Sequence, residues 1–152
     1  MPPSRSSILI TGASRGIGRA IALRFAREGW DVVAVARKQA ELDALRAEVI
    51  SAGGMCRTIA LDVADAGAVA RQLGGIEVDV LVNNAGVGVL KPLMELSPEE
   101  WHRMLDVNVN ALYHVTRAVL PGMFARKAGH VCTIGSIGGQ PAIAQSYMSI
   151  ST

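Results

Sequence analysis

The feature that most constrains this chain is a glycine-rich turn between an apolar run and a helical pattern. The apolar run is Ile8–Ile10, the turn reads Thr-Gly-Ala-Ser-Arg-Gly-Ile-Gly over residues 11–18, and the helical pattern continues to about residue 28. Glycines permit a tight turn and a close approach of phosphate to the backbone, and a helix N-terminus favours an anion. The turn therefore predicts a phosphate-binding loop. Its candidate contact residues are Gly12, Ser14, Arg15, Gly16, Ile17 and Gly18.

Strand-length apolar runs alternate with helical patterns along the whole chain. The expected strands are 7–11, 31–36, 56–61, 78–83 and 130–134, and the expected helices are 16–28, 38–52, 64–74 and 97–126. The strands are rich in Val and Ile and mostly do not alternate, which is typical of strands buried on both faces of a parallel sheet. The pattern predicts one α/β domain over residues 1–152: a Rossmann-like, doubly wound parallel sheet in three α/β/α layers.

Composition narrows the function classes. Half of the 152 residues are hydrophobic, the mean hydropathy is +0.31, and the net charge is +2 with scattered basic residues. These values favour a folded domain over a nucleic-acid or membrane binder. No apolar stretch reaches the roughly 18 residues of a membrane span, and no signal sequence begins the chain, so a cytoplasmic location is expected. Cys56 and Cys132 are expected to be buried, reduced thiols, and the three histidines lack metal-ligand spacing, so no metal is expected.

Further motifs follow the later strands at fixed places. Asp62-Val63 follows the third strand, Asn83-Asn84-Ala85-Gly86 follows the fourth, and Asn108 and Ser136 come later in the chain. Together with the glycine turn, these motifs resemble the short-chain dehydrogenases/reductases that have a compact Rossmann domain, over residues 7–147. The resemblance implies hydride transfer between a nicotinamide cofactor and a carbonyl or secondary alcohol carbon of a small-molecule substrate.

The end of the second strand indicates which cofactor is bound. A site for NAD usually has Asp or Glu there, bonded to the ribose 2′-hydroxyl. This chain has Ala36-Arg37-Lys38 instead, with Arg15 in the glycine turn. Guanidinium groups suit a 2′-phosphate, so the sequence favours NADP over NAD, with Arg37 as the main contact and Lys38 as a possible solvated surface charge.

The resemblance also assigns roles around the cofactor. It places Asp62 beside the adenine ring with Val63 packed near it, although Asp62 is equally suited to cap a helix before Ala64. It gives Asn83 a structural role in holding the central strands. The cofactor ribose is expected to pass the following three residues, which are Asn84, Ala85 and Gly86.

Three residues are the expected catalytic group. By resemblance, Ser136 bonds the substrate carbonyl oxygen, Tyr147 exchanges a proton with it, and Asn108 bends its helix and holds a water of the proton relay, with Asn110 as the weaker alternative. The family pattern is Tyr-x-x-x-Lys, but this chain has Ser151 in the lysine position. A tyrosine with no lysine beside it keeps a pKa near 10. The alternative is therefore a catalytically inactive nucleotide-binding fragment.

The last part of the sequence leads to expectations about length and assembly. A Rossmann sheet has a sixth strand, so the chain is expected to be the N-terminal, C-terminally truncated portion of such an enzyme. The strand at 130–134 then becomes a sheet edge, and the helix at 97–126 resembles a subunit-contact helix of the family. Homo-oligomers are expected, unless residues 135–152 fold back over the edge.

Overall fold

A five-stranded parallel sheet forms the centre of the computed structural model, which describes residues 5–136. The order of its strands is β3-β2-β1-β4-β5. The strands are β1 (Ser7–Thr11), β2 (Asp31–Ala36), β3 (Met55–Ala60), β4 (Val80–Asn83) and β5 (His130–Thr133). All five lie within one or two residues of the predicted strands, and the Rossmann-like α/β architecture is confirmed.

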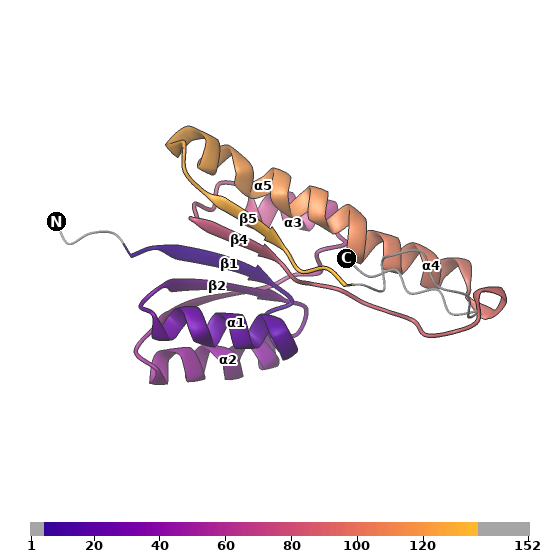
Figure 1. The fold of residues 1–152 in the computed structure, drawn as a ribbon, viewed down its shortest axis with the longest axis horizontal. Helices are drawn as coiled ribbons and strands as arrows, with labels where there is room; N and C mark the ends of the chain where they lie inside the picture. The colour runs from indigo at the N-terminus through magenta and orange to yellow at the C-terminus, as the bar shows by residue number, and fades with distance from the viewer. Residues whose placement is uncertain (1–4, 137–152) are drawn as a thin grey trace.

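Helices cover both faces of this sheet. In Figure 1, α1 (Gly16–Arg27) and α2 (Gln39–Ser51) lie on one side, and α3 (Ala66–Leu73) and α5 (Ala111–Arg126) lie on the other. A short 3-10 helix, η1 (Leu93–Glu95), precedes α4 (Pro98–Leu105), which lies beyond the carboxyl ends of the strands. None of the helices in the described range is both long and apolar enough to cross a membrane.

Alternate residues of the central strands supply two separate cores. Ile8 and Ile10 of β1 pack with α1 and α2, whereas Leu9 between them packs with α3 and α5. All three side chains are fully buried, and burying such a side chain stabilises a fold by roughly 1.5–3 kcal/mol. The same division on the neighbouring strand is Val32 and Ala34 on one face against Val33 and Val35 on the other. The absence of alternation in the sequence therefore reflects a sheet buried on both faces.

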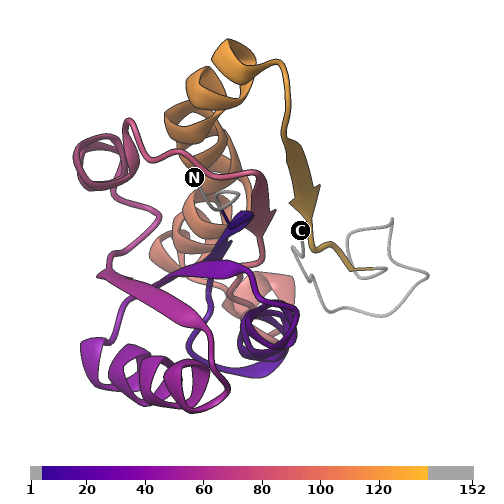
Figure 2. The same ribbon diagram turned by 90° about the vertical axis from the view of Figure 1, so that its left-hand side faces the viewer.

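The outer strands depart from the expected burial. Half of the residues of β3 are exposed, and all four residues of β5 are exposed. Their positions explain this, because β3 and β5 are the two edges of the described sheet (Figure 2). The expectation that Cys132 is buried is therefore wrong: its thiol is exposed in β5, while Cys56 in β3 is half-buried. Neither cysteine is in a disulfide.

The predicted helix over residues 97–126 is divided into three parts. Ser97 caps α4 as expected, by accepting a hydrogen bond from Glu100 N while Glu100 bonds back to Ser97 N. A π-helical segment, η2 (Asp106–Asn110), then separates α4 from α5. The extra residue of a π turn changes the direction of side chains locally, and such turns are frequent at functional sites. Asn108, where the resemblance implies a local bend, lies within this π-helical segment.

The difference in thiol burial gives a testable expectation. Burial raises the pKa of Cys56 to about 11, against the weaker lowering effect of Arg46. At pH 8 only roughly one Cys56 thiol in a thousand is then the reactive thiolate. A short pulse of iodoacetamide at pH 8 should therefore modify Cys132 well before Cys56, as read by peptide mass spectrometry. In a Cys132→Ser control, labelling should be slow at pH 8 and rise with pH; equal rates at both cysteines would contradict the described burial.

Candidate functional site

A cavity of about 300 Å³ opens at the carboxyl ends of β1, β2 and β4. The sheet order reverses at β1, which has β2 on one side and β4 on the other, and open α/β sheets bind ligands at this switch point. Eleven of the twelve residues that the sequence suggests as cofactor contacts line the cavity. They are Gly12, Ser14, Arg15, Gly16, Ile17, Arg37, Asp62, Val63, Asn84, Ala85 and Gly86.

The glycine turn leaves no room for side chains at two positions. Gly12 has φ +65°, and a Cβ there would lie 2.9 Å from Ala85 Cα. A Cβ on Gly18 would lie 2.5 Å from both Asn84 Nδ2 and the Gly12 carbonyl oxygen. Gly18 is thus a packing residue and does not line the cavity. The side chain of Arg15, the N-cap of α1, makes no cap hydrogen bond, so the helix N-terminus is open to an anion.

Thr11 and Asn84 tie the glycine turn to the loop after β4. Thr11 Oγ1 accepts hydrogen bonds from Asn84 N and Ala85 N, each at 3.0 Å. The Asn84 side-chain amide donates to Thr11 O at 2.9 Å and to Gly12 O at 3.2 Å. Two facing walls of the cavity are therefore held together by one polar network that satisfies buried backbone groups.

This network corrects the role expected for Asn83. Asn83 is buried, and its amide donates to Thr116 Oγ1 of α5 at 3.1 Å, so it fastens β4 to a helix. The link between the two central strands comes from Asn84 instead. Asn83 is the last residue of β4 and Asn84 is the first of the loop after it, and the sequence alone does not tell which of the two side chains faces β1. The sequence places Thr11 at the end of a strand and the start of the glycine turn, but it does not predict that its hydroxyl accepts two backbone hydrogen bonds.

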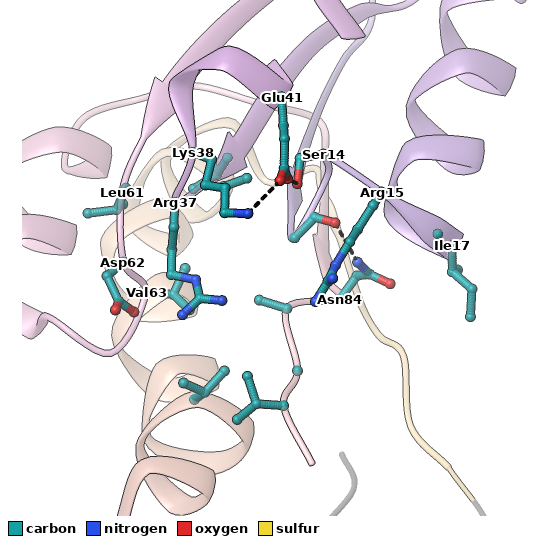
Figure 3. Close-up of a pocket in the computed structure, with 18 of the residues that line it drawn as sticks. Ser14, Arg15, Ile17, Arg37, Lys38, Glu41, Leu61, Asp62, Val63 and Asn84 are labelled. Atoms are coloured by element: carbon teal, nitrogen blue, oxygen red, sulfur yellow. Dashed lines mark hydrogen bonds and ion pairs between the residues drawn. The ribbon is translucent and has the colours of Figure 1, made fainter. Parts of the chain in front are cut away.

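Cationic side chains gather at one end of the cavity. Arg15 comes from the glycine turn and Arg37 from the end of β2, and Figure 3 shows both reaching toward the space between them. Neither arginine is in an ion pair within the described part of the chain. Lys38 also lines the cavity and pairs with Glu41 of α2 at 3.0 Å, and 73% of its side chain is exposed. Glu41 was not a sequence candidate.

A second ion pair lies in the cavity wall near Arg37. Asp62 Oδ2 lies 2.8 Å from Arg103 of α4, and Asp62 Oδ1 accepts a hydrogen bond from Ala64 N at 3.1 Å. Partial burial raises the pKa of Asp62, but the bonds from Ala64 and Arg103 outweigh it and leave the pKa below its ordinary value. The N-cap of α3 is Asp65, whose side chain accepts from Ala68 N. Asp65 and not Asp62 is therefore the N-cap of α3, and Asp62 lines the cavity.

Asn108 is buried and bonds the backbone of a residue that lines the cavity. Only 1% of its surface is exposed, its Oδ1 accepts from Val87 N at 2.9 Å, and its Nδ2 donates to Val87 O at 2.8 Å. Val87 itself lines the cavity. Asn108 thus holds the loop after β4 by both backbone groups of one residue. Asn110, the weaker alternative, is exposed and bonds Asp106 on its own helix segment.

Of the other expected catalytic residues, the structure describes only Ser136. Ser136 is exposed just after β5 and is not among the lining residues. Tyr147 and Ser151 lie outside the described residues. Within residues 5–136, no group of three or more His, Cys, Asp or Glu side chains could hold a metal ion.

Comparison with known sequences identifies the family of this chain. Residues 6–149 match the family described as short chain dehydrogenase. The NADP-dependent 3-hydroxy acid dehydrogenase YdfG of Salmonella typhi is 41% identical over 138 residues, which are 87% of this chain and 54% of that protein. The serine 3-dehydrogenase of Rhizobium radiobacter is 37% identical over 137 residues, with 86% and 53% covered. The chain spans about half the length of these curated relatives.

Solved structures agree with the sequence comparison. The crystal structure of a metagenomic short-chain oxidoreductase in complex with NADP superposes with a TM-score of 0.86 at 40% identity, covering 91% of this chain and 66% of that one. The chain belongs to the short-chain dehydrogenase family.

Proposed function

We propose that this chain binds NADP(H) in the cavity and is part of an oxidoreductase that acts on a carbonyl or secondary alcohol carbon. The observation that carries the proposal is the pair of guanidinium groups, Arg15 and Arg37, that reach into a cavity beside an uncapped helix N-terminus. The names of the relatives support it, since the Salmonella enzyme is NADP-dependent and the metagenomic oxidoreductase was crystallised with NADP.

The residues present fit this cofactor. The close approach of Gly12 to Ala85 leaves bare backbone for a pyrophosphate at the start of α1, next to Gly16 and Ile17. Arg37 and Arg15 would hold the 2′-phosphate through charge-assisted hydrogen bonds. The adenine ring would lie toward Asp62 and Val63. Asn84, Ala85 and Gly86 would line the path of the ribose.

The remaining residues would complete the reaction site. The bound cofactor supplies a hydride donor or acceptor at C4 of its nicotinamide ring. Ser136 would donate a hydrogen bond to the substrate oxygen, Tyr147 would move the proton to or from that oxygen, and Asn108 would position Val87 and a relay water. The relatives are named as a 3-hydroxy acid dehydrogenase and a serine 3-dehydrogenase, so a small hydroxy or oxo acid is the substrate class that we propose to try first.

We also propose that the chain forms homo-oligomers through α5. Its outer face has a groove with exposed Tyr113 and Phe124, and the edge strand β5 leaves backbone groups unpaired within the described sheet. A second copy of the chain would cover both features, because each copy presents the same faces.

The first test concerns cofactor preference. We expect NADPH to bind more tightly than NADH, and Arg37→Ala to weaken NADPH binding by roughly ten- to a hundredfold, since a hydrogen bond to a charged group contributes about 1.5–3 kcal/mol. Calorimetric titration of both cofactors measures this. Arg27→Ala removes an exposed arginine at the far end of α1 and serves as the matched control. Equal affinities for the two cofactors, or an Arg37→Ala variant that binds NADPH as before, would contradict the assignment.

The second test concerns proton transfer by Tyr147. Oxidation of an alcohol requires the phenolate, and with Ser151 in place of the lysine the phenol should keep a pKa of about 10. We therefore expect alcohol oxidation with NADP⁺ to stay below about 1 per second at pH 7 and to rise close to tenfold per pH unit up to pH 9. Tyr147→Phe should abolish this rise. A fast rate that is already level at pH 7 would show that another group activates Tyr147, and binding without any turnover would favour a purely nucleotide-binding role.

A further inference from the structure

Glu41 occupies the cationic end of the cavity without having a place in the proposed function. It lies in the first turn of α2, is half-buried, and lines the cavity. Its carboxylate accepts a hydrogen bond from Ser14 Oγ at 2.7 Å and pairs with Lys38 Nζ at 3.0 Å. Figure 3 shows Lys38 and Ser14 converging on this one carboxylate. The Glu41 carboxylate thus accepts hydrogen bonds from Ser14 and Lys38, two donors that could otherwise bind an anion in the cavity.

The electrostatic surroundings favour the charged form of Glu41. The hydrogen bond from Ser14 and the nearby Lys38 lower its pKa below the ordinary value, with a smaller contribution from Arg15. Glu41 therefore remains a carboxylate throughout the physiological pH range. A phosphate group placed between Arg15 and Arg37 would carry a further negative charge of about −1.5 to −2 into the same space.

A carboxylate and a phosphate in this space must compete for the same partners. Ser14 and Lys38 are donors, and each would satisfy a phosphate oxygen as well as a carboxylate oxygen. The phosphate of NADP(H) would either displace Glu41 from them or bind beside it against charge repulsion. NAD(H) has a neutral hydroxyl at this position, so it meets neither cost.

We propose that Glu41 is an internal counter-anion of the nucleotide cavity. When no cofactor is bound, its carboxylate binds Lys38 and Ser14. When NADP(H) binds, the carboxylate competes with the 2′-phosphate for these donors and so reduces the ratio by which the site binds NADP(H) more tightly than NAD(H). This inference rests on the proposed function, because it assumes that the cofactor phosphate enters beside Arg15 and Arg37. It makes Glu41 a specificity-determining residue on α2, outside the glycine turn and outside the end of β2.

The test is Glu41→Gln in the whole chain. Glutamine keeps the size of the side chain and an oxygen that accepts from Ser14, but it removes the charge. We expect the Kd for NADPH to fall by roughly three- to fivefold, the range that a partly exposed charge can supply, and the Kd for NADH to change less than twofold. Calorimetry with NADPH, NADH, 2′,5′-ADP and 5′-AMP separates the effect of the phosphate, because only the first and third probes carry it.

Two controls make the result decisive. Glu48→Gln removes a carboxylate of the same helix that pairs with Arg19 outside the cavity, and it should leave all four Kd values unchanged. In a Lys38→Ala background, Glu41→Gln should tighten NADPH binding less, because the released cation is gone.

The outcomes distinguish the inference from the proposed function. If the unchanged chain prefers NADPH and Glu41→Gln binds it no more tightly, Glu41 is no competitor and the inference is overturned, while the NADP(H) assignment stands. If Glu41→Gln tightens NADH as much as NADPH, the effect does not come from the phosphate and the inference is also overturned. If the unchanged chain binds neither cofactor, the proposed function fails, and the inference fails with it.

Discussion

The hydrogen-bond network between Thr11 and Asn84 is the constraint on which the rest of the site depends. It joins the turn after β1 to the loop after β4, across the point where the sheet order reverses. Gly12 and Gly18 let these two segments approach so closely that any side chain there would separate them. A bare backbone surface results, and the helix N-terminus beside it is left open. An anionic group can approach this surface because nothing but backbone stands in the way.

The charged side chains around this surface are of two kinds, those in ion pairs and those outside them. Asp62 is paired with Arg103 and Glu41 is paired with Lys38, whereas Arg15 and Arg37 have no ion-pair partner among the described residues. The matched pairs position the walls, and the two remaining arginines set the sign of the field inside the cavity. Asn108 adds a neutral support by holding both backbone groups of Val87. Selectivity for a phosphorylated nucleotide would then be a balance between two arginines that attract and one carboxylate that competes.

The sequence predicted most of the fold and the part of the site that is local in the chain. Features that depend only on residues close together in the sequence could be predicted. They are the strand positions, the glycine turn, Arg37 and the Ser97 cap. Glu41 and Arg103 were missed because their roles come from α2 and α4 packing against loops 27 and 41 residues away. Hydropathy also failed at β3 and β5, since an apolar strand at an edge has the same sequence signature as one in the middle. The sequence also did not show that Asn83 bonds to α5 while Asn84 bonds to the glycine turn. These roles depend on the direction of each side chain, which only the structure provides.

The central claim is that the cavity between the turn after β1, the end of β2 and the loop after β4 receives the nucleotide. The most direct measurement is a titration of the ¹⁵N-labelled chain with NADP⁺, followed by the chemical shifts of its backbone amides. If the nucleotide binds in this cavity, the largest shifts fall on residues 12–18, 36–38, 61–63 and 84–87, and they saturate together. Largest shifts along the outer face of α5, with the amides of the glycine turn unmoved, would contradict it.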